Sequence, residues 1–198
     1  MWENQSMTYI EFFPWPFVIS LMGLIVVTAH YRYRGWLYQP GIFMFGLYLM
    51  VVAQRVFFPI IIPEGWPASV NWGENFISAV RRINWIPFYY GPMFADLDAG
   101  KIPPQVVVWE IAGNVLLTIP FGAGLGFFSQ IRGRRMLGTA LVTGLALEGT
   151  QLLLSVLGLG RPRSVDINDV ILNSLGVLIG FGLFLIMERR FLRNAAEL

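Results

Sequence analysis

Two carboxylates and an amide begin the last apolar stretch of the chain. At about 100° per residue, they share one helical face with two glycines further along: Asp166, Asp169, Asn173, Gly176 and Gly180. Such carboxylates and amides can bind amines, hydroxyls or amides, and the two carboxylates could also hold a divalent cation. Carboxylates three residues apart are also common at helix N-termini, where the helix dipole favours them, so we predict no metal site from this spacing.

A second apolar stretch also carries small and polar side chains on one helical face. The stripe consists of Ala140, Gly144, Glu148, Gln151 and Ser155. Small residues at four-residue spacing let helix backbones approach closely in a membrane. We therefore expect this face to meet the face that begins at Asp166.

The composition indicates a membrane protein and excludes several kinds of site. Hydrophobic residues make up 56% of the 198 residues, charged residues only 13%, and the mean hydropathy is +0.60. The absence of cysteine excludes a disulfide framework, a thiolate zinc site and a cysteine nucleophile, and the single histidine, His30, cannot form a His-rich metal site. We predict no cofactor. The basic residues are scattered, so no nucleic-acid partner is expected either.

Five apolar stretches are long enough to cross about 30 Å of hydrocarbon as helices. They are approximately residues 12–31, 36–62, 106–128, 136–158 and 167–187. We therefore expect an all-α, polytopic integral membrane protein in which residues 1–198 form a single membrane domain.

The basic residues between the stretches predict the orientation of the chain, because cytoplasmic loops are enriched in Lys and Arg. One side holds Arg32, Arg34, Arg132, Arg134, Arg135, Arg189, Arg190 and Arg193. The other side holds fewer: Arg81, Arg82, Lys101, Arg161 and Arg163. We therefore predict that the N-terminus is outside and the C-terminus is in the cytoplasm.

With this orientation, the polar residues of the spans gather in the outer half of the membrane. They are Arg55, Glu110, Asn114, Glu148, Gln151, Asp166, Asp169 and Asn173. An ion facing lipid at mid-membrane costs about 2.5–3.5 kcal/mol, so these side chains should turn toward one another or toward water. The alternative to a functional site is a purely structural cluster, in which Arg55 neutralises Glu148 or Asp169 and holds the helices in register.

The connection at 63–105 is long enough to have structure of its own. Residues 75–84 have the apolar spacing of a short amphipathic helix that lies in the headgroup layer, and Pro87 ends any helix near Trp85. The aromatic residues that follow suit the membrane boundary. Two alternatives stay open: the loop is anchored there by its aromatic side chains, or it forms a lid over the polar residues.

Four segments resemble, in order, the motifs of the VanZ-like membrane proteins. N-W-I-P-F at 84–88 looks like the family's N-x-x-P-F motif, and G-N-V-L-L-T-I-P-F-G at 113–122 resembles its G-N-x-x-x-x-x-P-F-G segment. E-G-T-Q at 148–151 matches E-x-x-Q. The most specific segment is 163–180, which resembles R-x-x-D-x-x-D-x-x-x-N-x-x-G-x-x-x-G. The resemblance covers about residues 75–182; Thr118 and Asn168 depart from residue types common in the family, an aromatic and an acid respectively.

This resemblance implies a multi-pass protein of the bacterial cytoplasmic membrane, linked in some members to lowered susceptibility to glycopeptides, especially teicoplanin. It supplies no reaction. Together, the motifs and the intramembrane polar residues give the expected functional positions: Arg55, Asn84, Pro87, Phe88, Asn114, Glu148, Gln151, Arg163, Asp166, Asp169 and Asn173.

Two functions compete. In the first, the protein binds an amphiphile from the outer leaflet, either a lipoglycopeptide such as teicoplanin or a lipid-linked precursor of the cell envelope. Arg163 would pair with a phosphate or carboxylate of that partner. In the second, the protein is an enzyme that modifies a lipid-linked substrate, with Glu148 and Asp169 as acid and base, because carboxylates in unlike environments can divide those roles. Transport is a weaker alternative, and the sequence does not decide whether the chain forms a homo-oligomer.

Overall fold

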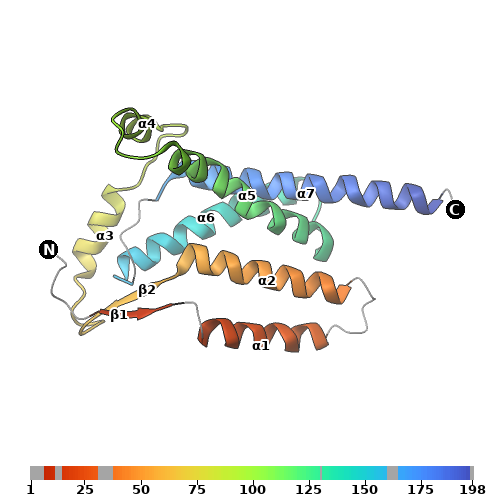
Figure 1. Cartoon of the computed structure of the whole chain (residues 1–198), viewed down its shortest axis with the longest axis horizontal. Coiled ribbons are helices and arrows are strands. Elements are labelled where there is room, and N and C mark those ends of the chain that lie inside the picture. Colours follow the sequence, from red (N-terminus) through yellow and green to blue (C-terminus); the bar gives the residue numbers. More distant parts are fainter. Residues whose placement is uncertain (1–6, 12–14, 31–37, 130, 160–164, 197–198) are drawn as a thin grey trace. The chain divides into compact units, whose positions relative to one another are not determined.

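The structure is a computed structural model that describes residues 7–11, 15–30, 38–129, 131–159 and 165–196. These residues form mostly helices, α1 to α7, together with two short strands (Figure 1). The chain divides into two compact units. The first unit comprises residues 1–83 and 149–165, and the second comprises residues 84–148 and 166–198. The expectation of a single membrane domain remains a prediction.

Four helices are long and apolar enough to cross a membrane. They are α2 (Tyr38–Phe57), α5 (Pro104–Phe128), α6 (Arg134–Val156) and α7 (Ile167–Ala196), the last over its segment Ile167–Arg190. They correspond to four of the predicted spans. Together with the composition, they support a membrane protein.

The first predicted span corresponds to α1 (Trp15–His30), a helix of 16 residues. At a rise of about 1.5 Å per residue, α1 is roughly 24 Å long and shorter than the hydrocarbon layer. The residues on both sides, 12–14 and 31–37, lie outside the described residues. The count of five spans and the orientation therefore remain predictions.

Two short strands form an element that the all-α prediction omitted. β1 (Met7–Ile10) pairs antiparallel with β2 (Ile60–Pro63), with Met7 opposite Pro63. The predicted span 36–62 is therefore too long. α2 ends at Phe57, two residues before Pro59, which has no backbone N–H to donate to a helix. Because Ile60 to Ile62 continue an apolar run, periodicity does not separate this strand from the helix before it.

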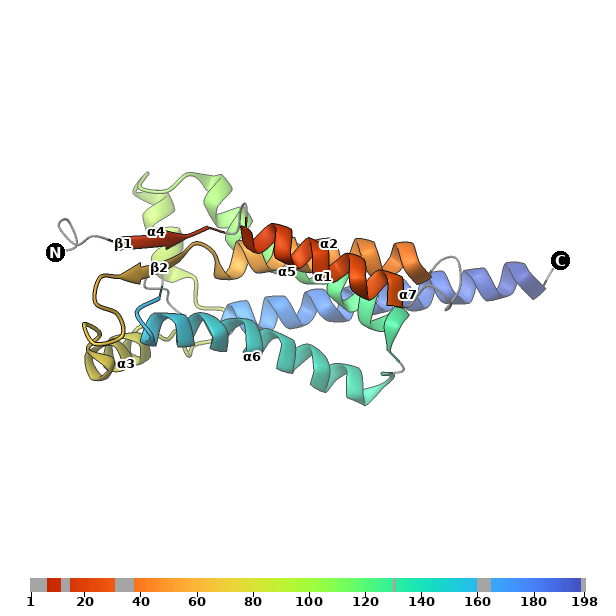
Figure 2. The same cartoon turned by 90° about the horizontal axis from the view of Figure 1, so that it is seen from below.

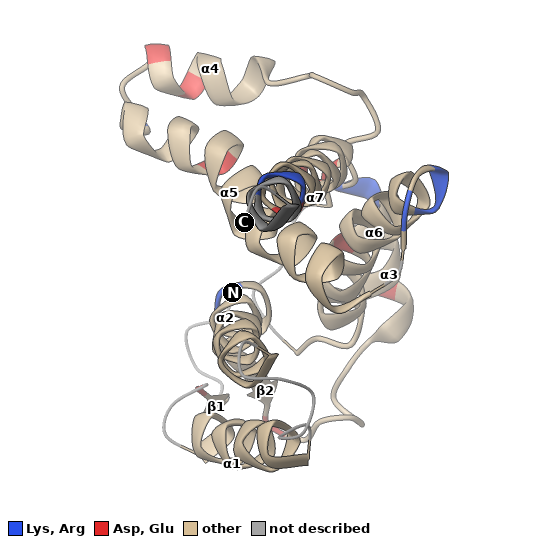
Figure 3. Cartoon of the chain, turned by 90° about the vertical axis from the view of Figure 1, so that its right-hand side faces the viewer, with Lys and Arg blue, Asp and Glu red and all other residues tan. Residues whose placement is uncertain are grey.

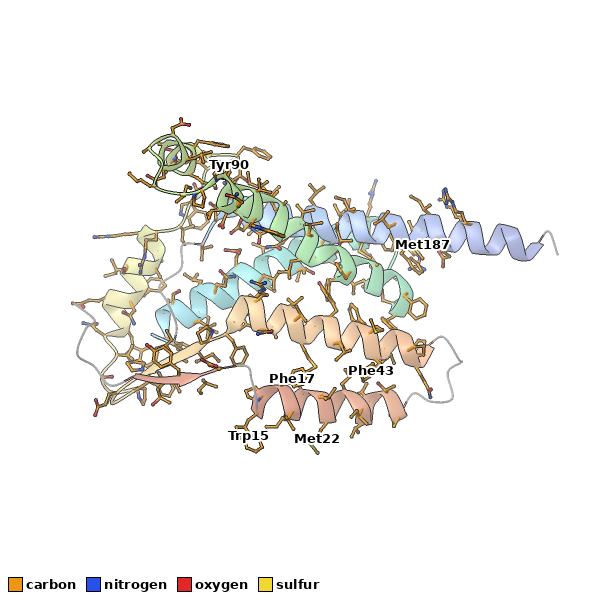
Figure 4. The ribbon with its side chains drawn as sticks, in the orientation of Figure 1. Trp15, Phe17, Met22, Phe43, Tyr90 and Met187 are labelled. Atoms are coloured by element: carbon orange, nitrogen blue, oxygen red, sulfur yellow. The ribbon has the colours of Figure 1, made fainter. Side chains whose placement is uncertain are left out.

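α1 packs against α2 in the first unit. Figure 4 shows Phe17 of α1 and Phe43 of α2 on the sides of their helices that face each other, whereas Trp15 and Met22 point away from α2. Trp15 is 72% exposed and Met22 is 63% exposed. These apolar side chains are suited to contact lipid.

The long connection contains a helix close to the predicted range 75–84. α3 (Trp72–Arg81) begins three residues earlier, where the side chain of Asn71 accepts a hydrogen bond from the backbone N–H of Glu74 at 3.2 Å. Within the same unit, Asn75 Nδ2 donates to the carbonyl of Val156 at 3.3 Å, and Trp66 Nε1 donates to that of Leu157 at 3.0 Å. The placement of α3 in the headgroup layer remains a prediction.

The second unit contains α4 (Gly91–Asp98), which the sequence did not predict, and is built on the packing of α5 along α7 (Figures 1 and 2). Glycines make this packing close. A Cβ atom at Gly122 would collide with the carbonyl oxygen of Val177, and one at Gly180 would collide with that of Ile119. The glycine face of α7 therefore meets α5, and the prediction that it meets the fourth span was wrong.

The fourth span instead meets a different face of α7. A Cβ atom at Gly144 of α6 would crowd the carbonyl of Val170, and Ser174 Oγ donates to the carbonyl of Ala140 at 3.1 Å. At 100° per residue, Val170 and Ser174 lie well round the helix from the glycines of α7. The buried core between these segments is formed by Met136, Ala140, Val177 and Phe181.

Candidate functional site

A group of polar side chains gathers around the N-terminal end of α7. We call it the polar cluster, and it consists of Asn84, Asn114, Glu148, Asp166, Asn168, Asp169 and Asn173. All of these residues belong to the second unit. Asn84 lies in the loop before α4, Asn114 on α5 and Glu148 on α6. The other four residues lie on α7 or directly before it.

Asp166 joins the loop to the start of α7. Asn84 Nδ2 donates to both carboxylate oxygens of Asp166 at 3.0 Å, and the backbone N–H of Asn168 donates to Oδ1 at 2.8 Å. The carbonyl of Asn84 accepts from the backbone N–H of Ile167 at 3.0 Å. Asp166 therefore satisfies a free N–H group of the first helical turn while holding the loop in place.

Glu148 brings a carboxylate from α6 to the same point. It is only 3% exposed, and its Oε2 accepts from the backbone N–H of Asp166 at 3.3 Å. A buried carboxylate requires compensating hydrogen bonds or charges. α6 therefore contacts α7 at Asp166, the first residue of the predicted face, although the glycines of that face meet α5.

Asp169 and Asn173 face α5. Asn114 Nδ2 donates to Asp169 Oδ1 at 2.5 Å and also to the carbonyl of Glu110, one turn earlier on its own helix, at 3.1 Å. One turn deeper, Thr118 Oγ1 donates to the backbone carbonyl of Asn173 at 2.8 Å. Polar contacts therefore join α5 and α7 at two successive levels.

Asn168 is a member of the cluster that the sequence analysis did not select. It is 1% exposed, and its Oδ1 accepts from the backbone N–H of Phe88 at 2.5 Å. Phe88 has a φ of +60°, in the left-handed region that is uncommon for residues other than glycine. The sequence marked Asn168 only as a departure from the family's residue type, which gave no reason to pair it with the loop.

The loop contacts the cluster through its backbone and Asn84 rather than through its rings. Trp85 is 68% exposed and Phe88 is 74% exposed, and Pro87 is exposed as well. A lid would bury these rings against the polar side chains. In this structure the rings therefore do not cover the polar side chains, and the anchor and the lid both remain predictions.

Tyr90, at the N-terminus of α4 and outside the spans, reports the charge of this region (Figure 4). Burial raises the pKa of Tyr90, and the negative charges of Asp166, Asp169 and Glu110 raise it further. The phenol is therefore neutral at physiological pH and remains a hydrogen-bond donor. Figure 3 shows acidic positions on α4 and α5 in this part of the unit.

Not every expected site residue is placed with the cluster. Arg55, on α2, and Gln151, on α6, belong to the first unit, and Arg163 lies outside the described residues. The pairing of Arg55 with Glu148 or Asp169 therefore remains a prediction. Within the described ranges, no three His, Cys, Asp or Glu residues are arranged to hold a metal ion.

The family comparison covers more of the chain than the motifs do. The family model described as VanZ/LLP1 matches residues 43–188, a range that includes α5, most of α7 and the whole polar cluster. No curated protein and no solved structure matches the chain. Because the match extends over well more than half of the sequence, and because its residues form the cluster described above, the chain belongs to the VanZ/LLP1 family.

Proposed function

We propose that the polar cluster binds the polar part of an amphiphilic molecule in the outer leaflet of the bacterial cytoplasmic membrane. The ligand is a lipoglycopeptide such as teicoplanin or a lipid-linked precursor of the cell envelope, and its binding lowers susceptibility to glycopeptides. Family membership supports a link to glycopeptide resistance. The ligand and the binding step are our own inference.

The supporting observation is the set of hydrogen bonds that gathers polar side chains at one end of long apolar helices. The hydrogen bond between Asn114 and Asp169 joins α5 to α7, and the hydrogen bond between Asn84 and Asp166 joins the loop at residues 84–90 to the start of α7. An amphiphile requires a polar site and an apolar surface side by side, because its head group forms hydrogen bonds and its acyl chain packs in hydrocarbon. Apolar side chains such as Trp109 and Leu116 on α5 are exposed along the same helix that carries Asn114.

The test is the teicoplanin susceptibility of cells that express the protein or its Asp169→Asn variant. The change removes the charge but keeps the size of the side chain and an oxygen that can accept from Asn114. We expect protection to fall at least tenfold, because the head of the ligand loses a charged partner, while immunoblotting finds an unchanged amount of protein in the membrane. The matched control is Asp96→Asn, at an exposed carboxylate on α4 paired with Lys101 at 2.7 Å. Full protection by the Asp169 variant would contradict the proposal.

A second candidate function is catalysis on a lipid-linked substrate. It is supported by the unlike surroundings of two carboxylates, since Glu148 is 3% exposed whereas Asp169 is only partly buried. Lipid profiling of cells with and without the protein tests it. A lipid species that appears or disappears with the protein, and no longer does so in a Glu148→Gln variant, would favour the enzyme over the binding protein.

A further inference from the structure

Among the described residues, one buried acceptor of the polar cluster has no partner. Asn173 is 2% exposed, and within the described part of the chain its Oδ1 accepts no hydrogen bond. A buried amide oxygen without a donor is unfavourable, so such atoms call for a specific explanation. A ligand that supplies the missing N–H or O–H group would provide one.

Asn173 lies one helical turn from Asp169 on α7. Asn173 follows Asp169 by four residues, so the two share one face of the helix, and helical side chains tilt toward the N-terminus. Both residues contact α5, because Asn114 donates to Asp169 and Thr118 donates to the backbone carbonyl of Asn173 one turn deeper. Asp169 and Asn173 therefore lie on successive turns of the face of α7 that contacts α5, and we take the two as one candidate site.

Among the described residues, the carboxylate of Asp169 has acceptor positions that no donor fills. A carboxylate has about four acceptor positions, and among the described residues the side chain of Asp169 accepts one hydrogen bond, from Asn114. Asp166 adds a second carboxylate three residues earlier, and Glu110 adds a third on α5. The raised pKa of Tyr90 has these same three charges among its causes, so their negative field extends to the loop above.

We infer that the polar cluster binds a primary ammonium group, which donates to the carboxylate of Asp169 and to Oδ1 of Asn173. An ammonium carries three N–H donors and a positive charge, so it supplies what both acceptors lack. This inference rests on the proposed function and narrows its ligand to an amphiphile with a primary amine. A water molecule could satisfy Asn173 but would bring no charge to the carboxylates.

The experiment measures which lipids the purified full-length protein retains, by native mass spectrometry. Three probes with identical acyl chains are compared: phosphatidylethanolamine, phosphatidylcholine and N-acetylated phosphatidylethanolamine. The first has a primary ammonium, the second a cation without N–H donors, and the third no cation on nitrogen. We expect at least tenfold greater retention of phosphatidylethanolamine than of either other lipid.

Two variants assign that preference to the site. Asp169→Asn removes the charge and Asn173→Leu removes the acceptor at similar volume, so each should bring the three lipids to within about twofold of one another. Asp96→Asn, outside the cluster, should keep the full preference. Either cluster variant tests the inference on its own if the other fails to fold.

Dissolved ethanolamine distinguishes the source of the amine. Displacement of phosphatidylethanolamine by millimolar ethanolamine would support a site that recognises the amine alone, whereas retention would support a site that also requires the lipid. Equal retention of all three lipids by the unaltered protein, or a preference that survives Asp169→Asn, would overturn the inference. In that case, loss of teicoplanin protection in the Asp169 variant would leave the proposed function standing. Full teicoplanin protection by that variant would contradict both the proposed function and the inference.

Discussion

At the scale of single residues, the sequence identifies charged side chains more readily than it identifies their partners. Asp166, Asp169 and Glu148 stand out because ions are rare in apolar stretches. Asn168 does not stand out, since its partner is the backbone N–H of Phe88 and no pattern of side chains marks a backbone group. The left-handed conformation of Phe88 is equally invisible before the fold is known.

That conformation gives a prediction at Phe88. Phe88→Gly should change the free energy of unfolding by less than about 1 kcal/mol. Glycine adopts positive φ readily, and the exposed ring of Phe88 contributes little packing that could be lost. The greater entropy of glycine in the unfolded chain offsets part of the stability gained by relieving the strain. Phe88→Val should destabilise the protein by about 1–2 kcal/mol, since β-branched residues tolerate positive φ poorly. Thermal unfolding in detergent checks both. Equal effects of the two changes would show that backbone strain at Phe88 is unimportant.

At the scale of elements, the sequence predicts helices well and their neighbours less well. Spans 106–128, 136–158 and 167–187 correspond to α5, α6 and α7, because apolar runs of this length permit little other than a helix that crosses the membrane. The glycine face of α7 was recognised as a packing surface but assigned to the wrong helix. A stripe of small residues shows that some helix approaches closely, and only the fold shows that it is α5.

The packing of α5 on α7 gives a prediction with a control on the same helix. Gly180→Ala should destabilise the protein by about 1–3 kcal/mol, because its Cβ would collide with the backbone oxygen of Ile119. Gly182→Ala should stabilise it by up to about 1 kcal/mol, because a Cβ there meets nothing within 4 Å and alanine favours helix. Unfolding temperatures of the purified variants check the pair. If both changes stabilise the protein, the close approach at Gly180 is wrong.

At the scale of the whole molecule, the account depends on which side of the membrane the polar cluster faces. The uneven distribution of Lys and Arg predicts that the loop before α3 is outside and the C-terminus inside. That loop joins β2 to α3 and contains Ser69, an exposed residue of the first unit.

The absence of natural cysteine makes the orientation directly measurable. In intact cells, a membrane-impermeant maleimide should label Ser69→Cys, whereas a cysteine added after Leu198 should react only after the membrane is permeabilised. Each added thiol is the only one in the protein, so the unaltered chain is the blank. The reverse pattern would place the long loop in the cytoplasm and exclude a ligand from the outer leaflet.

The most direct test of the central claim is photo-cross-linking of the full-length protein to an amphiphile with a photoreactive group beside its amine. Peptide mapping should place the cross-links in residues 84–90, 110–118 and 165–173, the segments that carry most of the polar cluster, and Asp169→Asn should reduce their yield at least tenfold. Cross-links spread along the exposed apolar faces of the helices, with the same yield in the Asp169 variant, would contradict the claim that this cluster binds the head of a ligand.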